Sequence, residues 1–125
     1  MLVIILVTLG VLALLFGINY LFPIIQVVGE SMYPTYLDGE ILVGTRLYRK
    51  SKLKKGDVIV YYSPTEEKKA VIKRIDSVSV GISRNELDFY CLGDNADRSY
   101  DSRDYGYISS KRIVCKIIDQ RRRQF

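Results

Sequence analysis

The sequence contains no histidine. This absence excludes Ser-His-Asp and Cys-His nucleophile systems, zinc sites built on imidazole, and every mechanism that uses histidine as the general base. Only two cysteines are present, Cys91 and Cys115. They are too few for a disulfide scaffold and lack the spacing of metal ligands, although they can form one disulfide or stay as buried thiols. We therefore expect neither a metal site nor a cofactor.

Charge is absent from the first part of the chain. The protein has 125 residues, and all 19 Lys and Arg and all 14 Asp and Glu residues lie within residues 30–125. This charged part, of about 95 residues, is long enough to fold around one small core. We expect three parts: an apolar N-terminal segment over residues 1–23, one folded domain over 24–119 and a frayed basic tail over 120–125.

The uncharged segment has the length of a membrane span. Residues 2–22 are almost entirely apolar, and as a helix they would extend about 31 Å, close to the roughly 30 Å of a hydrocarbon core. Tyr20 and Phe22 stand where interfacial aromatic residues are expected, and Pro23 ends the helix. The apolar run is longer than that of a cleavable signal peptide, about 7–15 residues, and no A-x-A-like site follows it. The sequence predicts a permanent single-span anchor.

The rest of the chain has strand-like patterns. Short apolar or alternating segments are separated by turn residues, and none has sustained helical periodicity. Short strands at close spacing predict a mainly β fold, with a small antiparallel sheet that is folded over or forms a partly open barrel. The expected strands are Ile24–Val28, Glu40–Thr45, Asp57–Tyr62, Ala70–Val80, Leu87–Leu92 and Arg112–Ile118.

Three polar segments carry candidate chemistry: residues 29–35 (GESMYPT), residues 70–75 (AVIKRI) and residues 93–106 (GDNADRSYDSRDYG). Each also has an ordinary interpretation. Ser31 fits a turn hydroxyl, and Lys73 fits a solvent-facing strand lysine. The charged residues of the third segment fit a surface ion pair worth under about 1 kcal/mol.

Strand periodicity favours a special environment for Lys73. On a period-2 strand, Val71, Lys73 and Ile75 share one face, and Arg74 points to the other. Lys73 then lies between two apolar neighbours on the inner face, where loss of water lowers the pKa of an amine. A neutral amine can accept a proton from a hydroxyl. Without histidine, a Ser31 nucleophile needs such a base, and Ser-Lys pairs are a known variant.

Four motifs in order resemble those of bacterial type I signal peptidases, the membrane-anchored Ser-Lys endopeptidases that remove signal sequences from exported proteins. Residues 31–35 match the nucleophile motif S-M-x-P-T, and residues 55–60 resemble the following G-D-x-V strand. Residues 72–75 resemble the K-R-V strand of the base, and residues 93–106 resemble G-D-N-x-x-x-S-x-D-S-R-x-x-G. The resemblance covers the anchor and essentially the whole domain, in a minimal form without the large β insertion of longer members.

The resemblance implies roles for individual residues. Ser31 would be the nucleophile and Lys73 the general base. Ser99 would hydrogen-bond the Lys73 nitrogen and fix its direction. Asp101 and Arg103 would form an ion pair that supports their loop.

The chain also departs from the family pattern at Gly29 and Ala96. Some members carry a hydroxyl two residues before the nucleophile that helps line the oxyanion hole, whereas this chain has Gly29. The hole would then depend on backbone N–H groups, above all that of Ser31. The usual arginine after Gly-Asp-Asn is Ala96. Shallow substrate pockets for small side chains are expected near Met32 and Pro34.

The sequence thus predicts a membrane-anchored signal peptidase that acts as a monomer and binds no nucleic acid. Its partners would be membrane lipid and preproteins with small residues at −1 and −3. The positive-inside rule places the basic domain in the cytoplasm, but this rule weakens for long domains. The resemblance places the domain on the extracytoplasmic side of the cytoplasmic membrane.

Two alternatives remain open at this stage. A dedicated peptidase that matures pilins or conjugation proteins would use the same chemistry on a narrower substrate range. A non-catalytic, membrane-tethered assembly factor would be expected to have lost the serine or the lysine, and this chain retains both.

Overall fold

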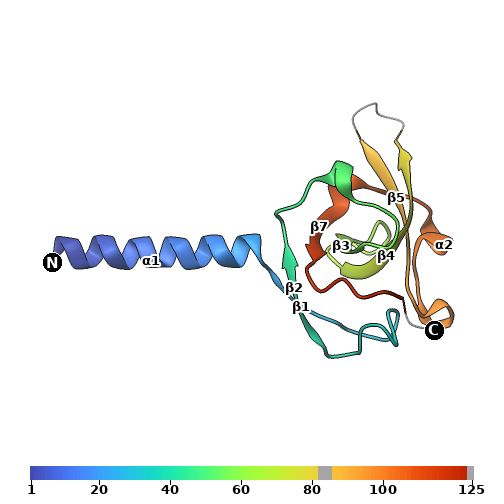
Figure 1. Ribbon diagram of the computed structural model, residues 1–125, viewed down its shortest axis with the longest axis horizontal. Coiled ribbons are helices and arrows are strands. Elements are labelled where there is room, and N and C mark those ends of the chain that lie inside the picture. The colour runs from blue at the N-terminus through green and yellow to red at the C-terminus, as the bar shows by residue number, and fades with distance from the viewer. Residues whose placement is uncertain (82–85, 124–125) are drawn as a thin grey trace.

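The fold is mainly β, with one long N-terminal helix, and the computed structural model describes residues 1–81 and 86–123. The helix extends away from one side of a small β domain (Figure 1). The α-helices are α1 (Leu2–Leu21) and α2 (Ser102–Tyr105), and the short 3-10 helices are η1 (Lys50–Lys52), η2 (Ala96–Arg98) and η3 (Ser110–Arg112). The strands are β1 (Ile24–Gln26), β2 (Ile41–Thr45), β3 (Val58–Tyr62), β4 (Ala70–Val80), β5 (Leu87–Leu92), β6 (Ile108–Ser109) and β7 (Ile113–Ile117).

Helix α1 has the properties predicted for a membrane span. None of its residues is buried against the domain, and it is long and apolar enough to cross a bilayer. Arg46, the residue after β2, holds the last turn of α1: its backbone N–H donates to the Leu21 carbonyl and its Nε donates to the Tyr20 carbonyl, both at 2.8 Å. A cation at these carbonyls is favourable because the C-terminal end of a helix is partly negative. The anchor is therefore attached to the domain by β2 as well as by the chain itself.

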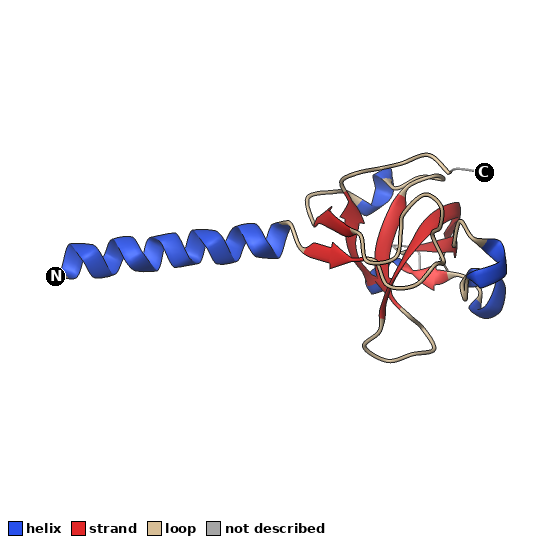
Figure 2. Ribbon diagram, turned by 90° about the horizontal axis from the view of Figure 1, so that it is seen from below, coloured by secondary structure: helices blue, strands red, loops and turns tan. Residues whose placement is uncertain are grey.

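The seven strands form one antiparallel sheet in the order β1-β2-β7-β3-β4-β5-β6. The sheet is not closed, since β1 and β6 are its two edges. Figure 2 shows the strands curling around one another rather than lying in a flat layer. This arrangement confirms the predicted mainly β fold with a folded-over, partly open sheet.

Both faces of the central strands are buried. On β3, Val58 and Val60 belong to one apolar cluster, while Ile59 and Tyr61 belong to a second. The alternation follows from the two-residue period of a strand. Folding the sheet over covers both faces, so the domain has two small cores on either side of β3 and β4.

The two cysteines lie in different cores. Cys115 packs in the first cluster and Cys91 in the second, and both are buried free thiols. Burial raises the pKa of the Cys91 thiol to about 12 and that of Cys115 to about 11. Of the two possibilities that the sequence left open, the structure has free, unreactive thiols.

The start of the predicted tail is not frayed. The Gln120 side chain accepts from the Val58 N–H and donates to the Val58 carbonyl. Arg121 contacts Glu40 and Asp119 through its guanidinium, which also lies 4.9 Å from the centre of the Tyr36 ring. The predicted tail residues 124 and 125 lie outside the described residues. The first tail residues are part of the domain because polar groups of the core bind them.

Candidate active site

Ser31 lies in the loop that follows β1, and buried side chains on both sides hold this loop. Val27, Met32 and Tyr36 are almost completely buried in the first core, whereas Ser31 is half-buried. The loop is therefore fixed at three points and presents its serine at the surface. Met32 was predicted to line a substrate pocket. That prediction is wrong, because the side chain is 0% exposed and serves as a core anchor.

Lys73 lies in the first half of β4 and faces the protein interior. Its face is shared with half-buried Val71 and buried Ile75, as the strand period predicts, and only 4% of the lysine is exposed. The opposite face is also covered, contrary to a simple inside–outside alternation. There, Ile72 packs in the first core and Arg74 pairs with Asp94.

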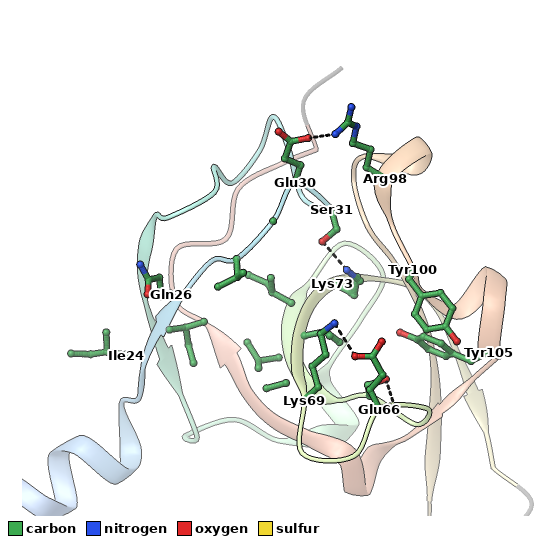
Figure 3. Close-up of a pocket in the computed structure, with 18 residues that line it drawn as sticks. Ile24, Gln26, Glu30, Ser31, Glu66, Lys69, Lys73, Arg98, Tyr100 and Tyr105 are labelled. Atoms are coloured by element: carbon green, nitrogen blue, oxygen red, sulfur yellow. Dashed lines mark hydrogen bonds and ion pairs between the residues drawn. The ribbon is translucent and has the colours of Figure 1, made fainter.

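The two side chains meet at hydrogen-bonding distance. The Lys73 Nζ lies 2.7 Å from the Ser31 Oγ (Figure 3). Burial lowers the pKa of Lys73 to about 8, although the nearby negative charge of Asp101 acts in the opposite direction. With this pKa, about a tenth of the molecules carry a neutral amine at pH 7. The neutral amine has a lone pair directed at a hydroxyl within proton-transfer distance.

Asp101 organises the loop beside the lysine. Its carboxylate is 0% exposed and accepts from the Gly93 N–H at 2.9 Å and from the Ser99 Oγ at 2.5 Å. Arg103 donates to it from Nε at 3.0 Å and from Nη2 at 2.5 Å. Burial alone would raise the pKa of Asp101, but these hydrogen bonds outweigh it and hold the pKa well below its usual range. The predicted ion pair between Asp101 and Arg103 is present.

Ser99 has a different partner from the one predicted. Its hydroxyl donates to Asp101, and no Ser99–Lys73 hydrogen bond occurs among the described residues. Ser99 packs against Gly93, where an added Cβ would lie only 2.1 Å from the Ser99 Oγ. Ser99 therefore supports the loop beside the lysine, and among residues 1–81 and 86–123 only Ser31 hydrogen-bonds the lysine nitrogen.

Removing the arginine of this cluster should destabilise the domain. In an Arg103→Ala variant, Asp101 keeps its backbone donors and Ser99 but loses two charged donors. We expect the free energy of unfolding to fall by about 2 kcal/mol. This is less than for a fully buried pair, because Arg103 is 39% exposed. Urea unfolding of the variant and the wild type measures this loss of stability. Lys111→Ala, which removes the exposed contact with Glu86, is the control and should have a much smaller effect. Equal losses in the two variants would contradict this account.

The loop before Asp101 connects the base strand to the nucleophile loop. Arg74, next to Lys73, donates to both oxygens of Asp94 at 2.8 Å. The next residue, Asn95, donates its N–H to the Ser31 carbonyl at 2.8 Å and its Nδ2 to the Glu30 carbonyl at 3.0 Å. The sequence analysis assigned no role to these three residues. Opposite charges in two motifs, at Arg74 and Asp94, are the signal that would have suggested their pairing.

Gly29 shapes the start of the nucleophile loop. Its φ of +87° lies in the region that favours glycine, and its N–H donates to the Asp38 Oδ1 at 2.8 Å. This N–H is therefore already occupied. Within residues 1–81 and 86–123, no acceptor pairs with the Ser31 N–H. Of the two, only the Ser31 N–H is available to an incoming group.

A groove of about 570 Å³ leads to the Ser31–Lys73 pair. One wall is β1 and the residues after it, and the other is the first half of β4 (Figure 3). Tyr100 and Tyr105, which the sequence analysis did not single out, also line the groove. Met32 and Pro34 were expected at the pocket, but neither is among the residues that line it.

The walls of the groove carry strand edges without partners. β1 pairs only with β2 among the described strands, and residues 70–73 of β4 pair only with β3, since pairing with β5 starts at Arg74. Two unpaired edges that face each other across a groove can accept an extended peptide as an added strand. The groove thus combines a peptide-binding geometry with a serine and a buried lysine at one end.

Comparison with known proteins identifies one family. The family model described as "Signal peptidase, peptidase S26" matches residues 1–81, which include Ser31 and Lys73. The chain is also similar to mitochondrial inner membrane protease subunit 1 of Schizosaccharomyces pombe. The two are 30% identical over 115 residues, which cover 80% of this chain and 73% of the relative.

Proposed function

Because the chain belongs to the S26 signal peptidase family, we propose that it is a membrane-bound serine endopeptidase in which Ser31 is the nucleophile and Lys73 the general base. The observation that best supports this proposal is the 2.7 Å contact between the Lys73 Nζ and the Ser31 Oγ. Burial of the amine supports it further, because burial keeps part of the lysine neutral near physiological pH.

The proposed reaction passes through an acyl-enzyme. The Ser31 Oγ attacks the scissile carbonyl carbon as its proton moves to the Lys73 Nζ. The C–N bond then breaks, and the Nζ gives this proton to the leaving amine. The acyl part of the substrate stays on the Ser31 Oγ as an ester. A water molecule next gives a proton to the Nζ and attacks the ester. The acid is released, and the Ser31 Oγ recovers its proton from Lys73.

The negative charge on the carbonyl oxygen requires a donor during both attacks. The Ser31 N–H fits this role because it has no acceptor within the described residues. The Gly29 N–H donates to Asp38, and Gly29 has no hydroxyl. One oxyanion donor is typically worth about 3 kcal/mol of transition-state stabilisation, so the rate depends strongly on the Ser31 amide.

The proposed substrates are preproteins whose signal peptides end in small residues at −1 and −3. An extended peptide between β1 and β4 would pair with the free edges of both strands and bring its carbonyl to Ser31. Side chains of an extended peptide alternate in direction, so those at −1 and −3 face the same wall of the groove. Small residues at these two positions match the known pattern of signal-peptide cleavage sites.

We place the enzyme at a membrane, with α1 as a single span. The family is one of signal peptidases, and the S. pombe relative is named as an inner membrane protease. We propose that the domain lies on the extracytoplasmic side of the cytoplasmic membrane. Confining enzyme and substrate to the same surface raises their effective concentration. Both catalytic groups come from one chain, consistent with a monomer.

A cleavage assay with matched substrates tests the proposal. We expect the full-length chain, in lipid vesicles, to cut a preprotein with alanine at −1 and −3 after the −1 residue, as mass spectrometry of the products would show. Leucine at −1 should reduce kcat/KM by about 100-fold or more, because the bulky side chain prevents the near-attack geometry. The control is leucine at −2, which points to the other side of the peptide. Equal cleavage of all three substrates would contradict the substrate assignment, and cleavage of none would contradict the enzymatic one.

The same assay separates the alternatives. A dedicated peptidase would cut one precursor from a panel and leave other alanine-containing precursors intact. A tethered assembly factor would bind precursors without cutting any of them. The retained contact between Ser31 and Lys73 favours a catalytic protein, because a binding protein has no need to bury a lysine beside a serine.

A further inference from the structure

Asn95 binds two successive carbonyls of the nucleophile loop. Its backbone N–H donates to the Ser31 carbonyl at 2.8 Å, and its side-chain Nδ2 donates to the Glu30 carbonyl at 3.0 Å. The two bonds reach 64 and 65 positions back along the chain and hold the peptide groups on both sides of Ser31.

Two donors hold the Glu30 carbonyl and thereby the direction of the Ser31 N–H: the Asn95 Nδ2 at 3.0 Å and the Tyr33 N–H at 3.1 Å. The Glu30 carbonyl and the Ser31 N–H belong to the same trans, planar peptide group, so they point in opposite directions. With its carbonyl held by Asn95 from one side and by the Tyr33 N–H within the loop, this peptide group directs the Ser31 N–H away from Asn95. No acceptor within residues 1–81 and 86–123 pairs with this N–H. A half-turn of the peptide group would exchange the two and place a carbonyl where the N–H now stands.

Asn95 is itself firmly placed. Asp94 is buried and bound to Arg74 by two hydrogen bonds of 2.8 Å, and the Gly93 N–H is bound to the buried Asp101 carboxylate. Gly93 lies so close to the nucleophile loop that an added Cβ would be 2.6 Å from the Ser31 carbonyl oxygen. The loop that carries Asn95 is thus fixed to β4, the strand that carries Lys73.

We propose that Asn95 is a positioning residue that orients the peptide group between Glu30 and Ser31 so that the Ser31 N–H donates to the oxyanion. The inference rests on the proposed function, since an oxyanion forms only if Ser31 is the nucleophile. It deepens that function because Asn95 is the side chain that, together with the Tyr33 N–H, holds the peptide group of the donor. Asn95 touches neither the substrate nor the reacting atoms and acts only through the backbone of the nucleophile loop.

The substitution Asn95→Asp tests the role with little change in shape. Aspartate keeps the backbone bond to Ser31 but replaces the donor facing the Glu30 carbonyl with an acceptor, which the carbonyl repels. Because the donor is misdirected but not deleted, we expect kcat to fall by about 10- to 100-fold, less than for a lost oxyanion donor. Asn95→Ala should act in the same direction. The KM should stay unchanged, since the groove is intact. The added carboxylate acts on Lys73 in the same direction as Asp101, so the apparent pKa of the pH–rate profile is compared in the uncharged Asn95→Ala variant, where it should stay unchanged.

Asp97→Asn is the matched control, because Asp97 lies exposed in the same loop and the substitution exchanges the same two side chains in the opposite direction. It should leave kcat unchanged. A peptide aldehyde gives a second readout, because it forms a tetrahedral adduct with the serine. Asn95→Asp should weaken aldehyde binding by a factor similar to the loss of kcat, while binding of the corresponding uncleavable peptide stays constant. A merely structural role would weaken both.

The outcomes separate this inference from the proposed function. Wild-type cleavage together with unchanged kcat in both Asn95 variants would overturn the role of Asn95 and leave the peptidase intact. Absence of wild-type cleavage would overturn the proposed function. In that case the backbone amide resonance of Ser31 still tests the peptide orientation. A Ser31 resonance unchanged by Asn95→Asp would overturn the inference, whereas a large shift confined to the nucleophile loop would support the orientation.

Discussion

Replacing Ser31 with alanine is expected to reduce preprotein cleavage by a factor of about 10⁴ or more, as in other proteases that lose their nucleophile. The hydroxyl is the atom that forms the acyl-enzyme, and in the proposed mechanism no other group takes its place. The domain should stay folded, because Ser31 is half-buried and the loop is held by Val27, Met32 and Tyr36. Quantitative cleavage of a radiolabelled preprotein at matched enzyme concentrations measures the loss.

The control for this variant is Ser79→Ala, which removes an exposed hydroxyl from the far half of β4. It should cleave at the wild-type rate. Circular dichroism and urea unfolding of the Ser31→Ala protein should match the wild type closely. Cleavage above one per cent of the wild-type rate in a folded Ser31→Ala variant would contradict the role of this serine.

Replacing Lys73 with methionine should cause a comparable loss of activity without any loss of stability. Methionine has nearly the same length but cannot accept a proton, so Ser31 loses its base. The change removes a buried amine whose charged form is disfavoured by loss of water. We therefore expect the variant to be at least as stable as the wild type at pH 7, by urea unfolding. An equally large loss of activity and of stability would instead indicate a structural lysine.

The stability difference should also depend on pH. The pKa of Lys73 is about 8 in the folded protein, below the 10.5 of an ordinary lysine. Between these two pH values the unfolded chain binds more protons than the folded one, so wild-type stability rises with pH in this range. The advantage of the Lys73→Met variant should therefore shrink as pH rises from 8 to 10.5 and be constant below that range. Lys52→Met, which makes the same exchange at an exposed position, is the control variant.

Much of the fold could be predicted from local patterns. The bounds of β4 and β5 were predicted without error, because both are long and bordered by clear turn residues. The C-terminal end of β1 and the start of β2 were predicted to extend further than they do, because the pairing between these two strands stops at Gln26 and Ile41. The two-residue strand β6 was missed. So short a strand has no periodic pattern of its own, and its pairing with β5 depends on tertiary structure.

For the predicted site, too, some features followed from local sequence patterns and others depended on the tertiary structure. The position of Lys73 followed from strand period and composition alone, and the structure places its amine beside Ser31. The partner of Ser99 and the place of Met32 at a substrate pocket were predicted wrongly, because both depend on how irregular loops fold against the core. The role inferred for Asn95 required three-dimensional contacts, since nothing local connects residue 95 with the carbonyls of Glu30 and Ser31.

The pH dependence of kcat/KM tests the central claim most directly, because that claim is a buried lysine acting as a neutral base. Only the neutral amine accepts the Ser31 proton. The account predicts a profile that rises with a single ionisation near pH 8, the pKa to which burial lowers Lys73, and that falls about tenfold per unit below it. A profile that stays flat from pH 6 to 9, or that rises only near pH 10.5, would contradict Lys73 as the base.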